Sequence, residues 1–148
     1  MRIGLLIPHC DATLEWDLQR VHGGTHGIHT ERMWLPEVSA EAERAMMDDD
    51  VPRAARYLAG AAPDVVVFGC TSAGALYGAE GEDRFTRDLA AQMGAPVISA
   101  YGSVRRQLAT EADERHVGVI TPYSRALHET VVDSLAGAGI ATEDAGCM

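Results

Sequence analysis

The sequence contains no lysine and no asparagine, and all 12 of its basic residues are arginine. Schiff-base enzymes, pyridoxal-phosphate enzymes and P-loop nucleotide hydrolases each need a lysine, so the chain cannot serve any of these three classes. Cysteine is also scarce. The three cysteines, Cys10, Cys70 and Cys147, have no CxxC spacing, and their odd number is a poor basis for a disulfide framework. Free thiols of this kind are typical of a reducing cytoplasm, which is the expected location.

Positive charge is in short supply as well. The chain has 22 acidic residues against 12 basic ones, for a formal net charge of −10. Nucleic-acid binding needs clustered positive charge, so no nucleic-acid partner is expected. An anionic ligand would be repelled at long range and must be captured by local hydrogen-bond donors. Long apolar runs are absent too: none approaches the roughly 18 residues of a membrane span, so no membrane partner is expected.

What the 148 residues do contain is an alternation of apolar runs and amphipathic segments, with 47% hydrophobic residues. This alternation predicts an α/β fold, a doubly wound parallel sheet with helices on both faces. Strands are expected at 2–7, 64–69, 95–100, 117–121 and from 140 onward. Helices are expected at 38–47, 51–60, 83–93 and 103–110, and a last helix is expected to be capped by Ser124 and to end at Gly137 or Gly139. The Gly- and His-containing segment 22–36 is expected to be a long loop.

Three of the expected strands end in polar segments, at 8–13, 69–74 and 121–124. In open parallel sheets, ligands bind beyond the carboxyl ends of the strands, so these segments should converge on one cleft. The middle segment is the most informative. Gly69 lets the backbone turn, and either Thr71 or Ser72 is expected to cap the next helix. The amides and dipole at that helix start would favour an anion, and would favour thiolate over thiol at Cys70.

Cys70 has a simpler interpretation as well, as a small buried residue that ends a core strand. The Gly-Cys-Thr-Ser-Ala-Gly context favours a functional role over this structural one. Other signals are weaker. His22, His26 and His29 lie in a Gly-containing segment, and no metal site is expected there. Arg32 is expected in a loop that closes over the cleft and meets a carboxylate. His116 and His128 are expected at the surface.

Three segments resemble one known family. Val-Val-Val-Phe-Gly-Cys-Thr-Ser at 65–72 resembles the first active-site loop of the aspartate/glutamate racemase superfamily. Gly-Leu-Leu-Ile-Pro at 4–8 is similar to its opening strand, and Val-Ile-Thr-Pro-Tyr at 119–123 to the strand that delivers a carboxylate-binding tyrosine. The closest branch holds maleate cis–trans isomerase and arylmalonate decarboxylase. The resemblance runs over nearly the whole chain in the same order.

The resemblance implies two similar α/β halves that face each other across a cleft, and a chemistry that uses no metal or cofactor. In racemases and isomerases of the family, each half supplies one cysteine, and by resemblance Cys70 is the catalytic cysteine of the first half. The residues that would hold the substrate carboxylate or line its pocket are Pro8, Asp11, Thr71, Ser72 and Tyr123.

Two features depart from the family pattern. Asp11 stands where the isomerases tend to have asparagine, and a carboxylate there would oppose an anionic substrate unless protonated. The second-half cysteine is missing, because the chain ends first. Residues 1–115 are therefore predicted to form the first half and 116–148 the incomplete start of the second. The chain is then either a natural short form that dimerises, and so acts as a homo-oligomer, or a fragment.

The sequence favours a cofactor-independent, cysteine-based isomerase or racemase of a small dicarboxylate, inactive alone if the second half is required. The alternatives are an arylmalonate-type decarboxylase and a non-catalytic α/β module for ligand binding or assembly. A thiol redox protein is a further alternative if Cys10 and Cys70 meet across neighbouring strand ends.

Overall fold

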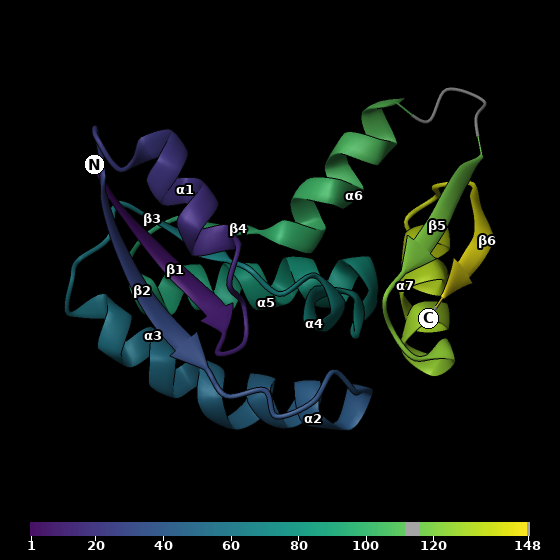
Figure 1. Cartoon of the computed structure of the whole chain (residues 1–148), viewed down its shortest axis with the longest axis horizontal. Coiled ribbons are helices and arrows are strands. Elements are labelled where there is room, and N and C mark those ends of the chain that lie inside the picture. Colours follow the sequence, from purple (N-terminus) through teal and green to yellow (C-terminus); the bar gives the residue numbers. More distant parts are fainter. Residues whose placement is uncertain (112–115, 148) are drawn as a thin grey trace.

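The computed structural model describes residues 1–111 and 116–147. In chain order the elements are β1 (Arg2–Pro8), α1 (Leu14–His22), β2 (Gly27–Met33), α2 (Ala40–Ala45), a π-helical turn η1 (Met46–Asp50), α3 (Val51–Ala59), β3 (Val65–Phe68), α4 (Thr71–Ala75), α5 (Gly78–Met93), β4 (Val97–Ser99), α6 (Ala100–Glu111), β5 (Val117–Thr121), α7 (Arg125–Gly137) and β6 (Thr142–Cys147). The strands form a parallel four-stranded sheet, in the order β2-β1-β3-β4, and a parallel pair, β5-β6 (Figure 1). The predicted α/β fold with parallel strands is confirmed.

The four-stranded sheet is covered on both faces, which explains why β1 and β3 are almost wholly apolar. Alternate residues of β1 point to opposite faces. Ile3, Leu5 and Ile7 pack with α1, whereas Leu6 joins the core on the other side, under α2, α3 and α5 (Figure 1).

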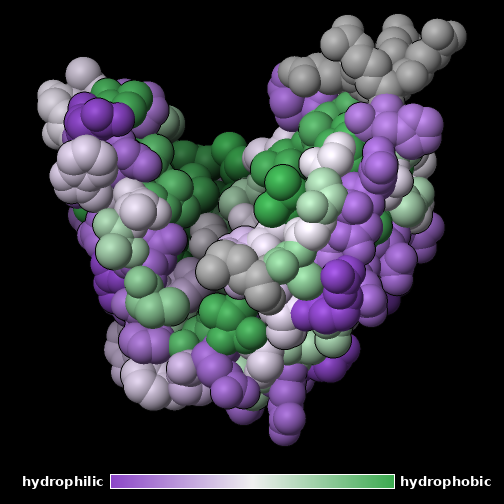
Figure 2. Space-filling model, turned by 45° about the vertical axis from the view of Figure 1, so that its right-hand side comes forward, coloured by the Kyte–Doolittle hydropathy of each residue, from purple (hydrophilic) through white to green (hydrophobic). Residues whose placement is uncertain are grey.

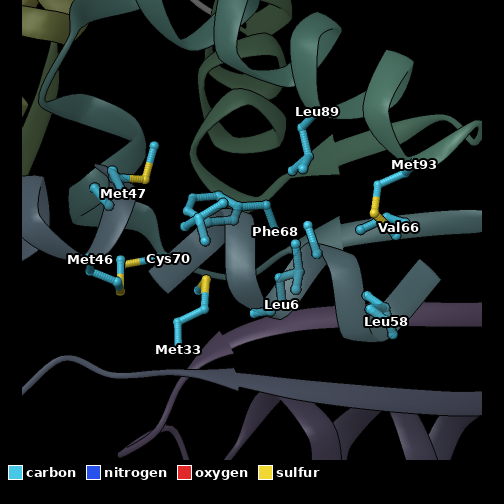
Figure 3. Packing of buried hydrophobic residues seen from close by; sticks show 14 of the residues in the cluster. Leu6, Met33, Met46, Met47, Leu58, Val66, Phe68, Cys70, Leu89 and Met93 are labelled. Carbon is cyan, nitrogen blue, oxygen red and sulfur yellow. The ribbon is translucent and has the colours of Figure 1, made fainter. Parts of the chain in front are cut away.

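The larger core lies on the second of these faces, and Phe68 is at its centre (Figure 3). Phe68 is fully buried and meets Phe85 edge-on, with ring centroids 4.9 Å apart. Met33 and Met46 lie at the end of this core where Cys70 joins it. The sulfur of Cys70 therefore sits at the boundary between packed hydrocarbon and the carboxyl end of the sheet.

The prediction of a loop over 22–36 was wrong, because β2 occupies Gly27–Met33 and pairs with β1 along its whole length. The reason is that β2 is an edge strand. It needs backbone pairing on one side only, and its polar side chains remain partly in solvent, so it lacks the apolar run that marks β1 and β3. The strand counted as fifth from the sequence is consequently the sixth.

The helices expected at 38–47 and 51–60 exist as α2 and α3, but η1 joins them directly. Pro52 lies in the first turn of α3, directly after the π-helical turn. The helix expected to start after Cys70 exists as α4 but has only five residues, and α5 begins five residues earlier than the predicted 83, at Gly78.

The second part of the chain is attached through α6, which runs from the four-stranded sheet toward β5, β6 and α7 (Figure 1). Tyr101 of α6 is 1% exposed, and its hydroxyl lies 2.5 Å from the Ser134 hydroxyl of α7. On its other side, Tyr101 packs against Gly74 of α4. One buried side chain thus links α4, α6 and α7.

Gly74→Ala is expected to destabilise the chain by about 1–3 kcal/mol through overpacking. A Cβ at Gly74 would lie 2.6 Å from the Tyr101 Cβ, which is too close to the α6 backbone to be relieved by a rotamer change. Urea unfolding measures the effect. Gly137→Ala is the matched control, since a Cβ there meets nothing within 4 Å, and a similar loss in both variants would contradict the explanation.

An apolar groove of about 270 Å³ opens beside β5, between α6 and α7. Val104, Leu108 and Val119 contribute to its walls, and the neighbouring Ile120 is 76% exposed. Figure 2 shows the molecule hollowed between the part that carries the four-stranded sheet and the part that carries α6 and β5, with apolar residues inside the hollow. This much exposed apolar surface is typical of a face that another polypeptide covers.

Candidate active site

A pocket of about 220 Å³ lies at the carboxyl ends of β1 and β3, against the turn between β5 and α7. All six residues singled out from the sequence line it, namely Pro8, Asp11, Cys70, Thr71, Ser72 and Tyr123. Cys10, Leu35, Val38 and Gly69 complete the lining. Three segments that are far apart in the sequence therefore meet at one site, where the ends of parallel strands were expected to bring them.

Cys70 connects β3 to α4 in an extended conformation, with φ −126° and ψ 104°. The preceding Gly69 is required by close packing: a Cβ there would lie 2.4 Å from Leu14 and 2.8 Å from Ile7. The prediction that Thr71 or Ser72 caps the next helix was wrong, because Cys70 itself occupies the N-cap position and no side chain caps α4.

The thiol of Cys70 is only 4% exposed, and burial raises its pKa to about 11. The backbone N–H of Ala73 and the hydroxyl of Ser72 act in the opposite direction, but they do not offset the burial. The prediction that the helix start makes Cys70 a thiolate was therefore wrong. The reasons are that α4 has only five residues and that the sulfur lies against the methionine-rich core.

Glu43 of α2 is a neighbour of the site that sequence reasoning missed. Its side chain is fully buried, and Oε1 accepts a hydrogen bond from the Ser72 hydroxyl. Burial raises the pKa of this carboxyl above its ordinary value. A signal for it exists in the sequence, since Met46 and Met47 follow at helical spacings of three and four, which places Glu43 on the apolar face of its helix.

Tyr123 brings a phenol to the opposite wall of the pocket. Burial raises the pKa of Tyr123, while a hydrogen bond with Ser72 lowers it. The phenol therefore stays protonated at neutral pH and is able to donate to a carboxylate. Ser72 links Glu43, behind the pocket, to Tyr123, in the pocket wall, because its hydroxyl interacts with both. The same hydroxyl lies 3.8 Å from the sulfur of Cys70.

The turn that carries Tyr123 is held by a buried histidine. His128 was expected at the surface, but it is 0% exposed, with Nε2 2.9 Å from Asp144 and Nδ1 3.0 Å from the Thr121 hydroxyl. The Thr121 hydroxyl in turn accepts from the backbone N–H of Tyr123 at 3.4 Å. The surface prediction failed because the partner Asp144 lies on β6, whose pairing with β5 was not visible in the sequence.

Asp11 lies in the pocket wall, but its carboxylate is already engaged by the start of α1. Its Oδ1 accepts from the backbone N–H groups of Thr13 and Leu14 at 3.0 and 2.9 Å. Arg32 is not in a loop, as predicted, but on β2, where it donates to the backbone oxygen of Asp11 and pairs with Glu15 at 2.7 Å. Both residues therefore have a structural task in fixing the turn after β1.

The described residues offer neither a disulfide nor a metal site. Cys10, Cys70 and Cys147 are all free thiols. Residues 1–111 and 116–147 contain no group of three His, Cys, Asp or Glu side chains arranged to hold a metal ion. No helix in this described part of the chain has the length and apolar character needed to cross a membrane.

No protein-family model matches the chain. The maleate isomerase of Nocardia farcinica is 32% identical to it, over 97% of this chain and 60% of that protein, and the maleate isomerase of Geobacillus stearothermophilus is 29% identical, over 97% and 61%. The chain is thus similar in sequence to maleate isomerases over nearly all of its own length. The resemblance inferred from the three sequence segments is confirmed.

Solved structures agree with this relationship. The maleate cis–trans isomerase of Nocardia farcinica, in a mutant form with a covalently bound succinylcysteine intermediate, has a TM-score of 0.80 at 28% identity, over 99% of this chain and 61% of that one. Arylmalonate decarboxylase has a TM-score of 0.74 at 19% identity, over 100% and 62%, which is a likeness of fold. The chain thus spans about three-fifths of the length of the relatives it matches.

Proposed function

We propose that this chain carries part of the active site of a cofactor-independent, maleate isomerase-like enzyme that acts on a small dicarboxylate. Cys70 is the nucleophile of this proposal, and Thr71, Ser72 and Tyr123 hold a substrate carboxylate. The observation that carries it is the convergence of the six expected residues on one pocket of about 220 Å³, in a chain similar in sequence to maleate isomerases.

In the proposed reaction, the Cys70 thiol first gives up its proton to a neighbouring base or to solvent, and the thiolate adds to one carbon of the cis double bond. The π electrons move onto the neighbouring carbon and its carboxylate, leaving a carbon–carbon single bond that rotates. The electrons then return, the carbon–sulfur bond breaks, and the trans diacid leaves. Hydroxyl donors serve this reaction because they stabilise the negative charge that develops on the carboxylate oxygens.

The succinylcysteine intermediate of the Nocardia farcinica enzyme supports a cysteine adduct as the step to look for. The fold likeness to arylmalonate decarboxylase does not favour decarboxylation over isomerisation, since it concerns the fold alone. Retention of Cys70 at the end of β3 favours the isomerase and racemase forms of the proposal.

Residues 1–115 as a first α/β half and 116–148 as the start of a second belong to the same proposal. The exposed groove beside β5 supports it, because in a two-half fold that face would pack against further chain. We propose a second copy of this chain as its occupant, which makes the protein a homo-oligomer. The free thiols fit a reducing compartment such as the cytoplasm as its place of action.

The test is to incubate the purified chain with maleate, aspartate, glutamate and an arylmalonate separately. Proton NMR measures turnover, and mass spectrometry with peptide mapping measures a covalent adduct. We expect an adduct with maleate at Cys70, and turnover only if the second half of the site is supplied by another copy. Thermal stabilisation by dicarboxylates without an adduct would instead favour a binding module. The absence of both an adduct and thermal stabilisation would contradict the proposal.

The proposed oligomer has its own measurement. Light scattering coupled to size-exclusion chromatography should give a mass of at least twice 15.8 kDa. Ile120→Asp should reduce it to the monomer, since a charge would then lie on the exposed apolar face. A monomeric wild type would contradict the homo-oligomer while leaving the Cys70 chemistry to be judged from the maleate experiment.

A further inference from the structure

Glu43 is a buried acid that the proposed reaction does not use. Its Oε1 accepts from the Ser72 hydroxyl, whereas Oε2 is buried without a hydrogen-bond partner among the described residues. An orphaned carboxylate oxygen in a fully buried position is costly, and such a site is retained only if something compensates the cost. The carboxyl lies behind the pocket wall rather than in it, and among the described residues its hydrogen bond to the pocket lining comes from Ser72.

Ser72 connects this acid to the proposed nucleophile. The hydroxyl of Ser72 lies 3.8 Å from the sulfur of Cys70 and donates to Glu43. The thiol, the hydroxyl and the carboxyl therefore form a continuous hydrogen-bonded series. These two contacts provide a path for a proton between the thiol and the carboxyl. The Cys70 thiol passes its proton to the Ser72 oxygen while the Ser72 proton passes to Oε1 of Glu43, giving a thiolate and a carboxylic acid with the net charge unchanged.

The groups around Cys70, Ser72 and Glu43 disfavour more than one negative charge on these three side chains. Cys10, on the turn after β1, and Tyr123, on the turn after β5, both interact with Cys70, and Tyr123 also interacts with Glu43. Asp11 adds a carboxylate to the pocket wall, and no arginine or histidine is among the lining residues. A Cys70 thiolate and a Glu43 carboxylate would therefore repel each other, with no cation among the lining residues to offset the repulsion.

We propose that Glu43 is a positioning residue that shares one proton with Cys70 through Ser72, so that the Cys70 thiolate forms chiefly while Glu43 is protonated. Only the choice of Cys70 as nucleophile rests on the proposed function. The raised pKa of Glu43 supports the inference, because it brings the titration of the carboxyl toward neutral pH. Coupled groups of this kind titrate as a pair rather than singly.

Sharing a proton has a distinctive signature in the reactivity of Cys70. Below the pKa of Glu43, the thiolate population rises about tenfold per pH unit, as for any thiol. Above it, each further thiolate requires the proton to move to Glu43, so the population stays flat until Cys70 ionises beside an already charged carboxylate. Removing the charge of Glu43 removes the flat region, so at pH values above the pKa of Glu43 the variant reacts faster than the wild type.

The experiment measures alkylation of Cys70 by iodoacetamide in the full chain between pH 5 and pH 10, with peptide mass spectrometry to separate Cys70 from the exposed Cys10. For the wild type we expect a rise, a plateau and a second rise. For Glu43→Gln, whose amide oxygen still accepts from Ser72, we expect a single rise of about tenfold per pH unit until Cys70 itself titrates, without a plateau, and at pH 8 a rate at least about tenfold above the wild type.

Glu41→Gln is the matched control, because Glu41 is on the same helix, is exposed and carries the same charge. It should reproduce the wild-type profile. The Cys70 Cβ chemical shift gives a second readout that needs no access for a reagent, and its titration midpoint should fall by at least about one pH unit in Glu43→Gln only.

A merely structural Glu43 would shift the rate by the same factor at every pH. A wild-type profile without a plateau together with an unmoved midpoint in Glu43→Gln would overturn the proposal. These outcomes do not depend on turnover of maleate, so a failure of the isomerase proposal and a failure of the shared proton are told apart.

Discussion

Cys70→Ala is expected to abolish the maleate adduct and to lower any turnover by at least about 10³-fold, since a nucleophile has no substitute once its sulfur is gone. The backbone at residue 70 is extended and the side chain is small and buried, so alanine fits the site without strain. Maleate binding through Thr71, Ser72 and Tyr123 should persist. A thermal-shift titration with maleate, beside adduct detection, separates lost chemistry from lost binding.

Cys147→Ala is the matched control, because Cys147 is also a free thiol but lies at the end of β6, outside the pocket lining. It should form the adduct as the wild type does. Equal adduct formation or equal turnover by Cys70→Ala would remove Cys70 from the mechanism. The free energy of unfolding must be measured for both variants, because loss of a buried sulfur from the core has a stability cost of its own.

Phe68→Ala is expected to destabilise the chain by about 3–5 kcal/mol, the largest effect on stability that we expect from a single core substitution. The ring is fully buried in the larger core, and its edge-on contact with Phe85 would be lost as well. Against a total stability of about 5–15 kcal/mol for a domain, this loss is about a fifth of the total or more. Urea unfolding followed by circular dichroism measures it.

Ile98→Ala is the control for Phe68→Ala. Ile98 is also apolar and lies on β4 of the same sheet, but it is 44% exposed, so its truncation should cost less than about 1 kcal/mol. Similar losses in the two variants would mean that the core cluster around Phe68 does not carry the stability of the four-stranded sheet.

Some parts of the candidate site were predictable from the sequence for a simple geometric reason. The apolar runs at 2–7 and 64–69 are typical of strands buried on both faces of a parallel sheet, and parallel strands end at the same edge of a sheet. This places Pro8 and Cys70 at the same edge, whereas the direct pairing of β1 with β3 is known only from the structure. Tyr123 also follows a strand, but β5 belongs to the separate pair β5-β6, so the role of Tyr123 came from the family resemblance and its place beside Cys70 depends on how the two sheets pack.

Other parts were not predictable, because they depend on packing between segments that the sequence does not relate to each other. The polar edge strand β2 is fixed by its backbone bonds to β1, and a hydrogen-bonding pattern leaves no apolar signature in the sequence. His128 is buried only because Asp144 arrives from β6 to pair with it. In both cases the decisive partner lies elsewhere in the chain.

The sequence by itself determined the α/β architecture, the resemblance to maleate isomerases and the identity of the residues at the strand ends. These follow from residue type and order, which are local properties. Only the tertiary structure decided that Cys70 is a buried thiol rather than an exposed thiolate, and that its neighbour behind Ser72 is Glu43. The pKa of a side chain is set by the solvent and charges that surround it, and those surroundings exist only once distant segments have packed together.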